Sequence, residues 1–337
     1  MKMHPLIGFC LTRVRAAVLT MLAVSLLLYA VLELDSGTVA VKVLGAFSTD
    51  GQRVIWLHQN GYDDGFFLRY WRWFSGFLIG DWGFSTHYRV PVLSLVLQRL
   101  GATALLAFLV LLFMVPLGLG LGILSGIMAG RRTDRVISVM AIITTSIPDY
   151  ASCSFLSAIF VVGLQWLPGA STMTDGFNLR QFALPVAVLV LYSSGYVIRI
   201  TRAAISVEMG RPYVRTARLK GADYSYIVLR HVVRNALSAP LTVIMLQIPW
   251  LMSGVIVVEV FFGYRGFGSL LYDGALNSDF PVIEACAMLS VAVVTTSQLL
   301  SELATALLDP RQRSVLLPYR RKSTELPAVT NTRDAVL

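Results

Sequence analysis

The residue types that most often carry chemistry are present in this chain, but they are not spaced for catalysis or metal binding. The four histidines are scattered, and the sequence contains no H-E-x-x-H pair, no G-x-S-x-G turn and no G-x-x-x-x-G-K-[ST] loop. Cys10, Cys153 and Cys286 lie far apart and are interpreted as small apolar core residues. We therefore predict that the chain is not an enzyme, binds no cofactor or metal and cannot hydrolyse ATP by itself.

One acidic residue lies inside a long apolar stretch. Asp149 follows Pro148 within residues 136–167, which otherwise carry no charge. If this stretch crosses a membrane, a lipid-facing acid costs at least about 2.5–3.5 kcal/mol, so Asp149 is expected to face a cavity or a partner. Two interpretations stay open: a carboxylate that lines a pore and contacts a cationic group, or a helix-packing hydrogen bond beside a kink at Pro148. The second is favoured.

The most informative polar segment spans residues 200–236 and is rich in arginine. Its interior predicts a helix over 214–220, a turn at Gly221 and a second helix. Glycine suits this turn because a sharp turn between helices often needs a left-handed backbone conformation. The segment is longer than a connection between two antiparallel helices requires, which favours a docking element. The alternative is a basic amphipathic helix that lies on anionic lipid.

The composition of the chain indicates that membrane-spanning helices position the polar residues described above. The chain has 337 residues, of which 56% are hydrophobic and 14% charged, and its mean hydropathy is +0.69. Soluble domains carry about 25% charged residues, so this chain is predicted to be an integral membrane protein. Its net charge of +9 is attributed to basic residues kept on the cytoplasmic side of a membrane, and no nucleic-acid partner is expected.

Six apolar stretches are long enough to be candidate membrane spans, for which about 20 residues are needed. They are residues 16–32, 100–130, 136–167, 181–198, 235–258 and 285–301. The first is compatible with a cleaved signal peptide, but its length favours a retained anchor. Gly118, Gly122, Gly126 and Gly130 recur every four residues in the second stretch, and this spacing predicts close packing against another helix.

Basic residues predict the orientation of the spans. An N-terminus in the cytoplasm places most of the 28 Lys and Arg residues in inside segments, and six spans return the C-terminus to the same side. The predicted fold is an all-α membrane protein with six transmembrane helices and both termini cytoplasmic. The predicted divisions are 1–34 with the first helix, an extracytoplasmic segment 35–95, a five-helix core 96–313 containing the cytoplasmic loop 200–236, and a flexible tail 314–337.

The loop residues match a known pattern. Arg215-Thr-Ala-Arg-Leu-Lys-Gly221, followed by Arg234-Asn-Ala-Leu237, resembles the "EAA" loop of permease subunits of binding-protein-dependent ABC importers, in the form of the oligopeptide/dipeptide/nickel branch. Gly80-Asp-Trp-Gly-Phe-Ser85 and Glu259-Val-Phe-Phe-Gly-Tyr-Arg-Gly-Phe-Gly268 resemble segments of that branch's first permease subunit. The chain departs from the branch after the first span, where Leu34-Asp-Ser-Gly-Thr38 replaces the usual Pro-Gly-Asp-Pro turn.

The resemblance implies a type I importer permease fold and a defined set of partners. These are two ATPase subunits that bind ATP and Mg, a second homologous permease, an extracytoplasmic solute-binding protein and the lipid bilayer. The expected location is a bacterial or archaeal plasma membrane, the inner membrane in a Gram-negative cell. The implied solute is a peptide or a peptide-like molecule. The expected contacts with the ATPase are Arg215, Thr216, Ala217, Lys220, Gly221 and Asp223.

A translocation path follows from the same interpretation. Its candidate residues are Pro148, Asp149, Gln247, Trp250 and Glu259, although Glu259 lies near the end of its span, which favours an interfacial position. The main alternative function is a secondary transporter or channel that uses Asp149 as a proton or cation site, which leaves the basic loop unexplained. An intramembrane enzyme and a membrane scaffold are the remaining alternatives, and neither accounts for the ordered motifs.

Overall fold

The structure is a computed structural model that describes residues 5–33, 40–41, 44–45, 47–59, 61–173, 178–253 and 255–308. The predicted tail 314–337 and residues 35–39 of the predicted outer segment lie outside these ranges. Helices dominate the described residues, and the β-structure among them is a single bridge between Phe84 and Pro91. This agrees with the all-α prediction.

Four helices are long and apolar enough to cross a membrane by themselves. They are α1 (Pro5–Glu33), α5 (Val92–Ile127), α8 (Leu179–Met209) and α15 (Phe280–Leu308). Two bent pairs also meet the criteria when each pair is taken together. In the first, α6 (Arg132–Ser146) meets α7 (Asp149–Ser157) and the π-helix η1 (Ala158–Gly163) at 104°; in the second, α10 (Tyr224–Tyr226), η2 (Ile227–Val233) and α11 (Arg234–Ala236) meet α12 (Ser238–Ser253) at 49°.

Two of the predicted spans, 136–167 and 235–258, contain breaks in the structure. The first is broken after α6 because Ile147 is extended and Pro148 has no amide hydrogen to continue the helix. The second ends at Ser253, and a separate short helix, α13 (Ile256–Phe262), follows. Helix α8 continues through Met209, so the first ten residues of the predicted loop 200–236 are helical.

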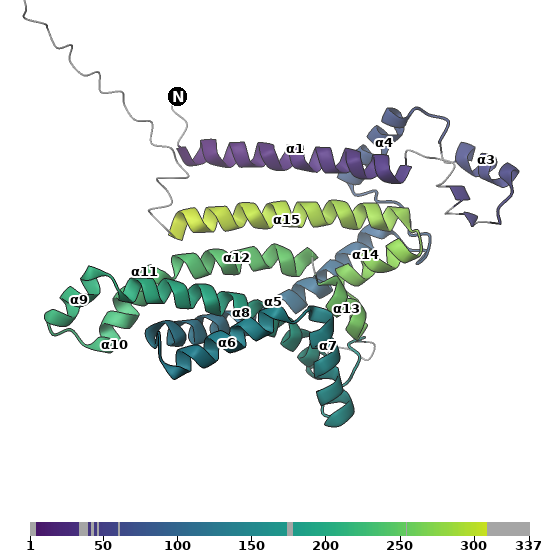
Figure 1. The fold of residues 1–337 in the computed structure, drawn as a ribbon. Coiled ribbons are helices and arrows are strands. Elements are labelled where there is room, and N and C mark those ends of the chain that lie inside the picture. Colours follow the sequence, from purple (N-terminus) through teal and green to yellow (C-terminus); the bar gives the residue numbers. More distant parts are fainter. Residues whose placement is uncertain are drawn as a thin grey trace, which may run out of the picture.

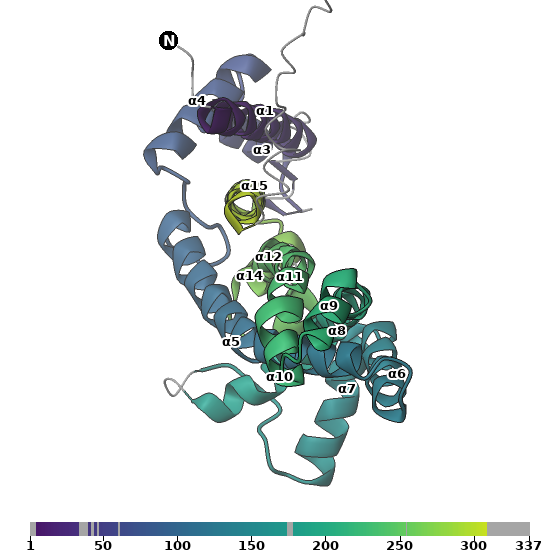
Figure 2. The same cartoon turned by 90° about the vertical axis from the view of Figure 1, so that its left-hand side faces the viewer.

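The long helices run side by side and give the molecule two distinct ends. Figure 1 shows the start of α1, the last residues of α15 and the short helix α9 (Pro212–Leu219) at one end, which we call the α9 end. Helices α3 (Asp50–Gln59), α4 (Phe66–Ile79) and α14 (Phe267–Leu276) lie at the other, the α14 end. Figure 2 looks along the bundle and shows α1, α15, α12 and α8 following one another in a row, with α7 projecting from it.

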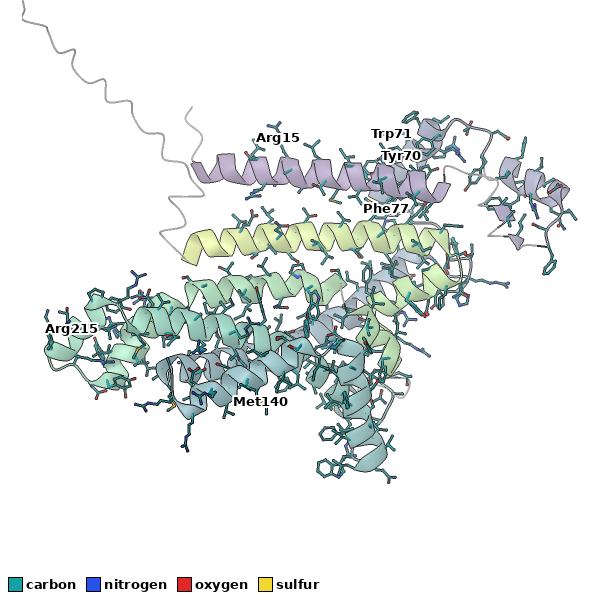
Figure 3. The ribbon with its side chains drawn as sticks, viewed as in Figure 1. Arg15, Tyr70, Trp71, Phe77, Met140 and Arg215 are labelled. Carbon is teal, nitrogen blue, oxygen red and sulfur yellow. The ribbon has the colours of Figure 1, made fainter. Side chains whose placement is uncertain are left out.

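Aromatic side chains join α4 to the neighbouring helices at the α14 end. The ring of Tyr29 at the end of α1 lies 5.6 Å from that of Tyr70, and the ring of Phe77 stacks on Trp82 at 4.7 Å. Figure 3 shows Tyr70 and Phe77 on α4 beside the ends of α1 and α15. Part of the predicted outer segment 35–95 is therefore helical and packed against the ends of the spans.

The glycine spacing in α5 produces a close contact between α5 and α8. A Cβ atom at Gly118, Gly122 or Gly126 would lie 2.8, 2.5 and 2.6 Å, respectively, from side-chain atoms of Val197, Thr201 and Ile205 on α8. These glycines thus allow the two backbones to approach, which confirms the predicted close packing for three of the four glycines. Gly130 lies beyond the end of α5, and no atom of the described residues is within 4 Å of a Cβ built there. Cys153 and Cys286 are fully buried in apolar clusters, as predicted; the side chain of Cys10 lies outside the described set.

Candidate functional site

The predicted helix–turn–helix is present between α8 and α12. Helix α9 begins with Pro212, whose fixed φ suits a first helical position, and it ends at Leu219, with Lys220 as its C-cap. Gly221 then adopts φ +76°, which reverses the chain with a left-handed residue. The Asp223 carboxylate accepts hydrogen bonds from the amides of Ser225 (3.0 Å) and Tyr226 (3.3 Å) and so caps α10. We call residues 212–236 the candidate coupling element.

The candidate coupling element is packed firmly against the ends of two spanning helices. Its core consists of Val214, Ile227, Val232 and Ala236, which bury themselves against Ile205 of α8, and partly buried residues of α5 join this cluster. A rigid-body movement of the element must therefore displace the ends of both α5 and α8.

Polar contacts reinforce this attachment. The Tyr213 hydroxyl donates a hydrogen bond to the Glu208 carboxylate (2.8 Å), and the Asn235 amide contacts the same hydroxyl (3.5 Å). Burial raises the pKa of Tyr213 above its ordinary value, and its bond to the Glu208 carboxylate adds to that rise. The hydroxyl consequently stays protonated at neutral pH and ties α9 to the end of α8.

The structure brings the predicted contact residues together, with one difference. Arg215, Thr216, Lys220, Gly221 and Asp223 are all exposed around the turn, and Figure 3 shows Arg215 at the tip of the α9 end. The side chain of Ala217 instead packs on the cluster beneath α9, so it supports the helix from within. The predicted contact of Ala217 with the ATPase stays a prediction, because this side chain is only partly exposed.

Large apolar side chains on the same surface were missed by the sequence analysis. Leu219 is 81% exposed, and Tyr224, Tyr226 and Leu229 are also exposed. The Arg218 guanidinium lies over the Tyr224 ring at 5.5 Å. Exposed apolar groups rimmed by charge are typical of a surface that docks a protein partner. The available signal was the presence of apolar and aromatic residues in a segment too polar to be a span.

A buried ion pair near the α9 end was also missed. Asp134 pairs with Arg202 of α8, with 2.5 Å between Oδ1 and Nε and 2.8 Å between Oδ2 and Nη2. The Asp134 carboxylate also accepts hydrogen bonds from the Ser125 hydroxyl (2.6 Å) and the Gly130 amide (2.8 Å). This carboxylate therefore joins α5, α6 and α8 close to the candidate coupling element.

The predicted path residues lie on three different elements. Pro148 and Asp149 stand at the start of α7, at the 104° bend between α6 and α7. Asp149 is partly buried. On α12, the Trp250 ring stacks on Tyr192 with 5.4 Å between ring centroids. The partly buried Gln247 makes no hydrogen bond within the described residues.

Glu259 is fully buried and its carboxylate is held by specific donors. Its Oε1 accepts a hydrogen bond from the Thr103 hydroxyl (2.5 Å), and its Oε2 accepts one from the Ser269 amide (2.8 Å). The Thr103 oxygen in turn accepts from the amide of Phe267 (2.8 Å). Glu259 thus fastens the start of α14 to α5, and its interfacial position in the membrane stays a prediction.

Comparison with known proteins identifies the relatives of this chain. Residues 118–314 match the family described as "Binding-protein-dependent transport system inner membrane component". The chain is 28% identical to "Probable peptide ABC transporter permease protein y4tP" of Sinorhizobium fredii, over 90% of this chain and 99% of that protein. It is 27% identical to "Oligopeptide transport system permease protein AppB" of Bacillus subtilis, over 90% and 98%. It is 30% identical to "Glutathione transport system permease protein GsiC" of Salmonella paratyphi A, over 91% and 99%.

Proposed function

Because this chain belongs to the binding-protein-dependent ABC importer permeases, we propose that it moves a peptide or peptide-like solute into the cytoplasm. Relatives named as peptide, oligopeptide and glutathione permeases support this solute class. The family is the membrane-spanning component of such transporters. The ATPase subunits would bind ATP and Mg, and this chain would bind no cofactor.

The proposed topology has six spans with both termini in the cytoplasm. Each bent pair counts as one span, which adds two to the four long helices. The start of α1 and the end of α15 both lie at the α9 end (Figure 1). Arg13, Arg131 and Arg132 are at this end too, and basic residues favour the cytoplasmic side. The α14 end would then face outward, toward the solute-binding protein, from a bacterial or archaeal plasma membrane.

One observation carries the proposal. The turn of the candidate coupling element is exposed, while the apolar core of the same element packs against the ends of α5 and α8. We propose that an ATPase subunit binds Arg215, Thr216, Lys220, Gly221 and Asp223, with Leu219 entering an apolar pocket of that partner. Ala217 supports α9 from beneath. The remaining proposed partners are a second ATPase, a second homologous permease and the binding protein; no nucleic acid is involved.

Coupling in this scheme depends on contacts that differ between the two ATPase states. When the ATPases close, the candidate coupling element moves as one body because its apolar core is continuous with the ends of α5 and α8. The glycine contacts between those helices transmit the movement along the bundle. The proposed path uses Pro148 and Asp149 at the bend with Gln247 and Trp250 on α12, whereas Glu259 supports the outer segment.

Replacing Gly221 by aspartate tests the coupling proposal. No atom of the described residues lies within 4 Å of a Cβ built at Gly221, and aspartate is among the residues that tolerate left-handed backbone. The variant should therefore fold, but a carboxylate should disturb docking at the turn. We expect solute-stimulated ATPase activity of the reconstituted complex to fall about 5- to 150-fold, the range of common coupling free energies.

Gly221→Asn is the matched control, because asparagine has the same shape and backbone tolerance without the charge. It should retain most of the stimulation. Equal loss in both variants would indicate backbone strain, and no loss in either would exclude this turn as the contact. Uptake that persists without ATP would favour the alternative, a secondary transporter that uses Asp149.

A further inference from the structure

A polar cavity of 480 Å³ lies at the α14 end, between the first turns of α5 and the segment formed by α13 and α14. Its wall includes Tyr88, Arg99, Arg265, Tyr272 and Asp273. Helix α5 has 36 residues and is about 54 Å long, well beyond the roughly 30 Å of a bilayer's hydrocarbon core. Its first turns, including Arg99, can therefore stand outside the hydrocarbon.

The charged side chains that line this cavity differ in whether they have hydrogen-bond partners. Asp273 accepts a hydrogen bond from the Tyr88 hydroxyl (2.9 Å), and the buried Glu259 carboxylate is held by Thr103 and Ser269. Arg99, which is partly buried, and Arg265, which is exposed, make no ion pair or hydrogen bond with any described residue. The wall thus holds two carboxylates that accept hydrogen bonds and two guanidinium groups that have no direct ion-pair partner among the described residues.

Two guanidinium groups without a direct partner among the described residues favour an anion that presents two oxygen atoms. Guanidinium donors match the geometry of carboxylate and phosphate oxygens in pairs, and such charge-assisted hydrogen bonds are stronger than neutral ones. A partly buried arginine gains more from such a ligand than a fully solvated one, because the local dielectric is lower.

We propose that this cavity binds the terminal carboxylate of the solute as it enters from the binding protein. This inference rests on the proposed function, since every unmodified peptide presents such a group whatever its side chains. The phosphate of an anionic lipid headgroup has the same chemistry, and the experiment below distinguishes the two sources.

Hydrogen bonds beside the cavity connect its wall with helix α5. The Tyr264 hydroxyl donates a hydrogen bond to the Ala102 carbonyl (2.7 Å), and Glu259 holds Thr103, so α13 and α14 are tied to α5 one turn beyond Arg99. The far end of α5 packs in the cluster beneath α9. The same helix thus contacts both the anion cavity and the candidate coupling element.

Direct binding of trialanine tests this inference. The probe is radiolabelled trialanine at millimolar concentration, compared with trialanine amide, which lacks the carboxylate. The sample is the complete permease–ATPase complex, without binding protein, in phosphatidylcholine nanodiscs. We expect the amide to bind at least about tenfold more weakly, the loss associated with one strong charged contact. Arg99→Gln and Arg265→Gln should each cause a similar loss for the free acid.

Arg180→Gln is the matched control, because Arg180 is an exposed arginine at the α14 end that lies outside the cavity. It should bind trialanine as the wild type does. Equal binding of acid and amide, or full binding by both Arg99→Gln and Arg265→Gln, would overturn the inference. Loss of trialanine binding when phosphatidylglycerol is added would assign the cavity to a lipid headgroup instead. ATP-dependent uptake by the wild-type complex with binding protein, measured in parallel, tests the proposed function separately.

Discussion

Replacing Gly122 by valine is expected to prevent the chain from accumulating as folded protein. A Cβ at this position would lie 2.5 Å from the Thr201 Cβ and 3.0 Å from the Ile198 carbonyl oxygen. The second contact is with backbone, so a change of side-chain conformation on α8 cannot relieve it. Overpacking costs about 1–3 kcal/mol and occasionally more, and we expect the upper end of this range here.

Gly120→Val provides the control for this prediction. Gly120 lies two residues away on the same helix, and no atom of the described residues is within 4 Å of a Cβ built there. The two variants share the same change in helix propensity and apolarity, so their difference isolates the contact with α8. Size-exclusion profiles and thermal unfolding in detergent should show a large loss for Gly122→Val only. Similar behaviour of both variants would mean that α5 and α8 do not pack as described.

Local sequence patterns predicted two kinds of feature: those that depend on the spacing of residues along a helix, and those that depend on the backbone conformation of one glycine. The four-residue repeat of glycines predicted that α5 packs closely against another helix, because small residues at that spacing share one helix face; the structure identifies that helix as α8. Gly221 marked the turn after α9 for a similar reason. Helix α9 also contained a signal that we overlooked: Val214 and Ala217 are three residues apart, so they lie on the same, inward face.

Features that depend on distant partners could not be predicted in the same way. Pro148 indicated a kink, but the 104° angle also depends on the packing of α7 against α8 and α13, which are remote in sequence. The burial of Glu259 likewise depends on Thr103, 156 residues earlier in the chain. A charge near the end of an apolar stretch has the same local signature whether it faces water or is held inside by donors from another helix.

The pairing of Asp134 with Arg202 is the clearest such case. In the sequence, Arg202 is one of many basic residues of the segment 200–236, and Asp134 is one acid among three arginines in a short turn. Their separation of 68 residues conceals an interaction between α6 and α8. A lone acid in a basic turn is a signal worth following, because an uncompensated buried carboxylate would be strongly destabilising.

Asp134→Asn is therefore predicted to be the most damaging polar substitution near the α9 end. Asparagine keeps the shape of aspartate, but it leaves the Arg202 guanidinium without its counter-charge. Removing one partner of a buried ion pair costs about 3–5 kcal/mol, and we expect about 3 kcal/mol because the Arg202 side chain is 37% exposed. Thermal unfolding of the purified chain should show a clearly lower midpoint.

Asp50→Asn serves as the control because Asp50 pairs with Arg53 while its own side chain is 97% exposed. Exposed pairs contribute about 0–1 kcal/mol, so this variant should unfold close to the wild type. The buried pair also fixes α8 just before the candidate coupling element, and its loss should loosen the base on which that element moves. We therefore expect Asp134→Asn to lower uptake per ATP hydrolysed, in addition to lowering stability. Unchanged unfolding and unchanged coupling together would show that the pair does not hold α6 to α8.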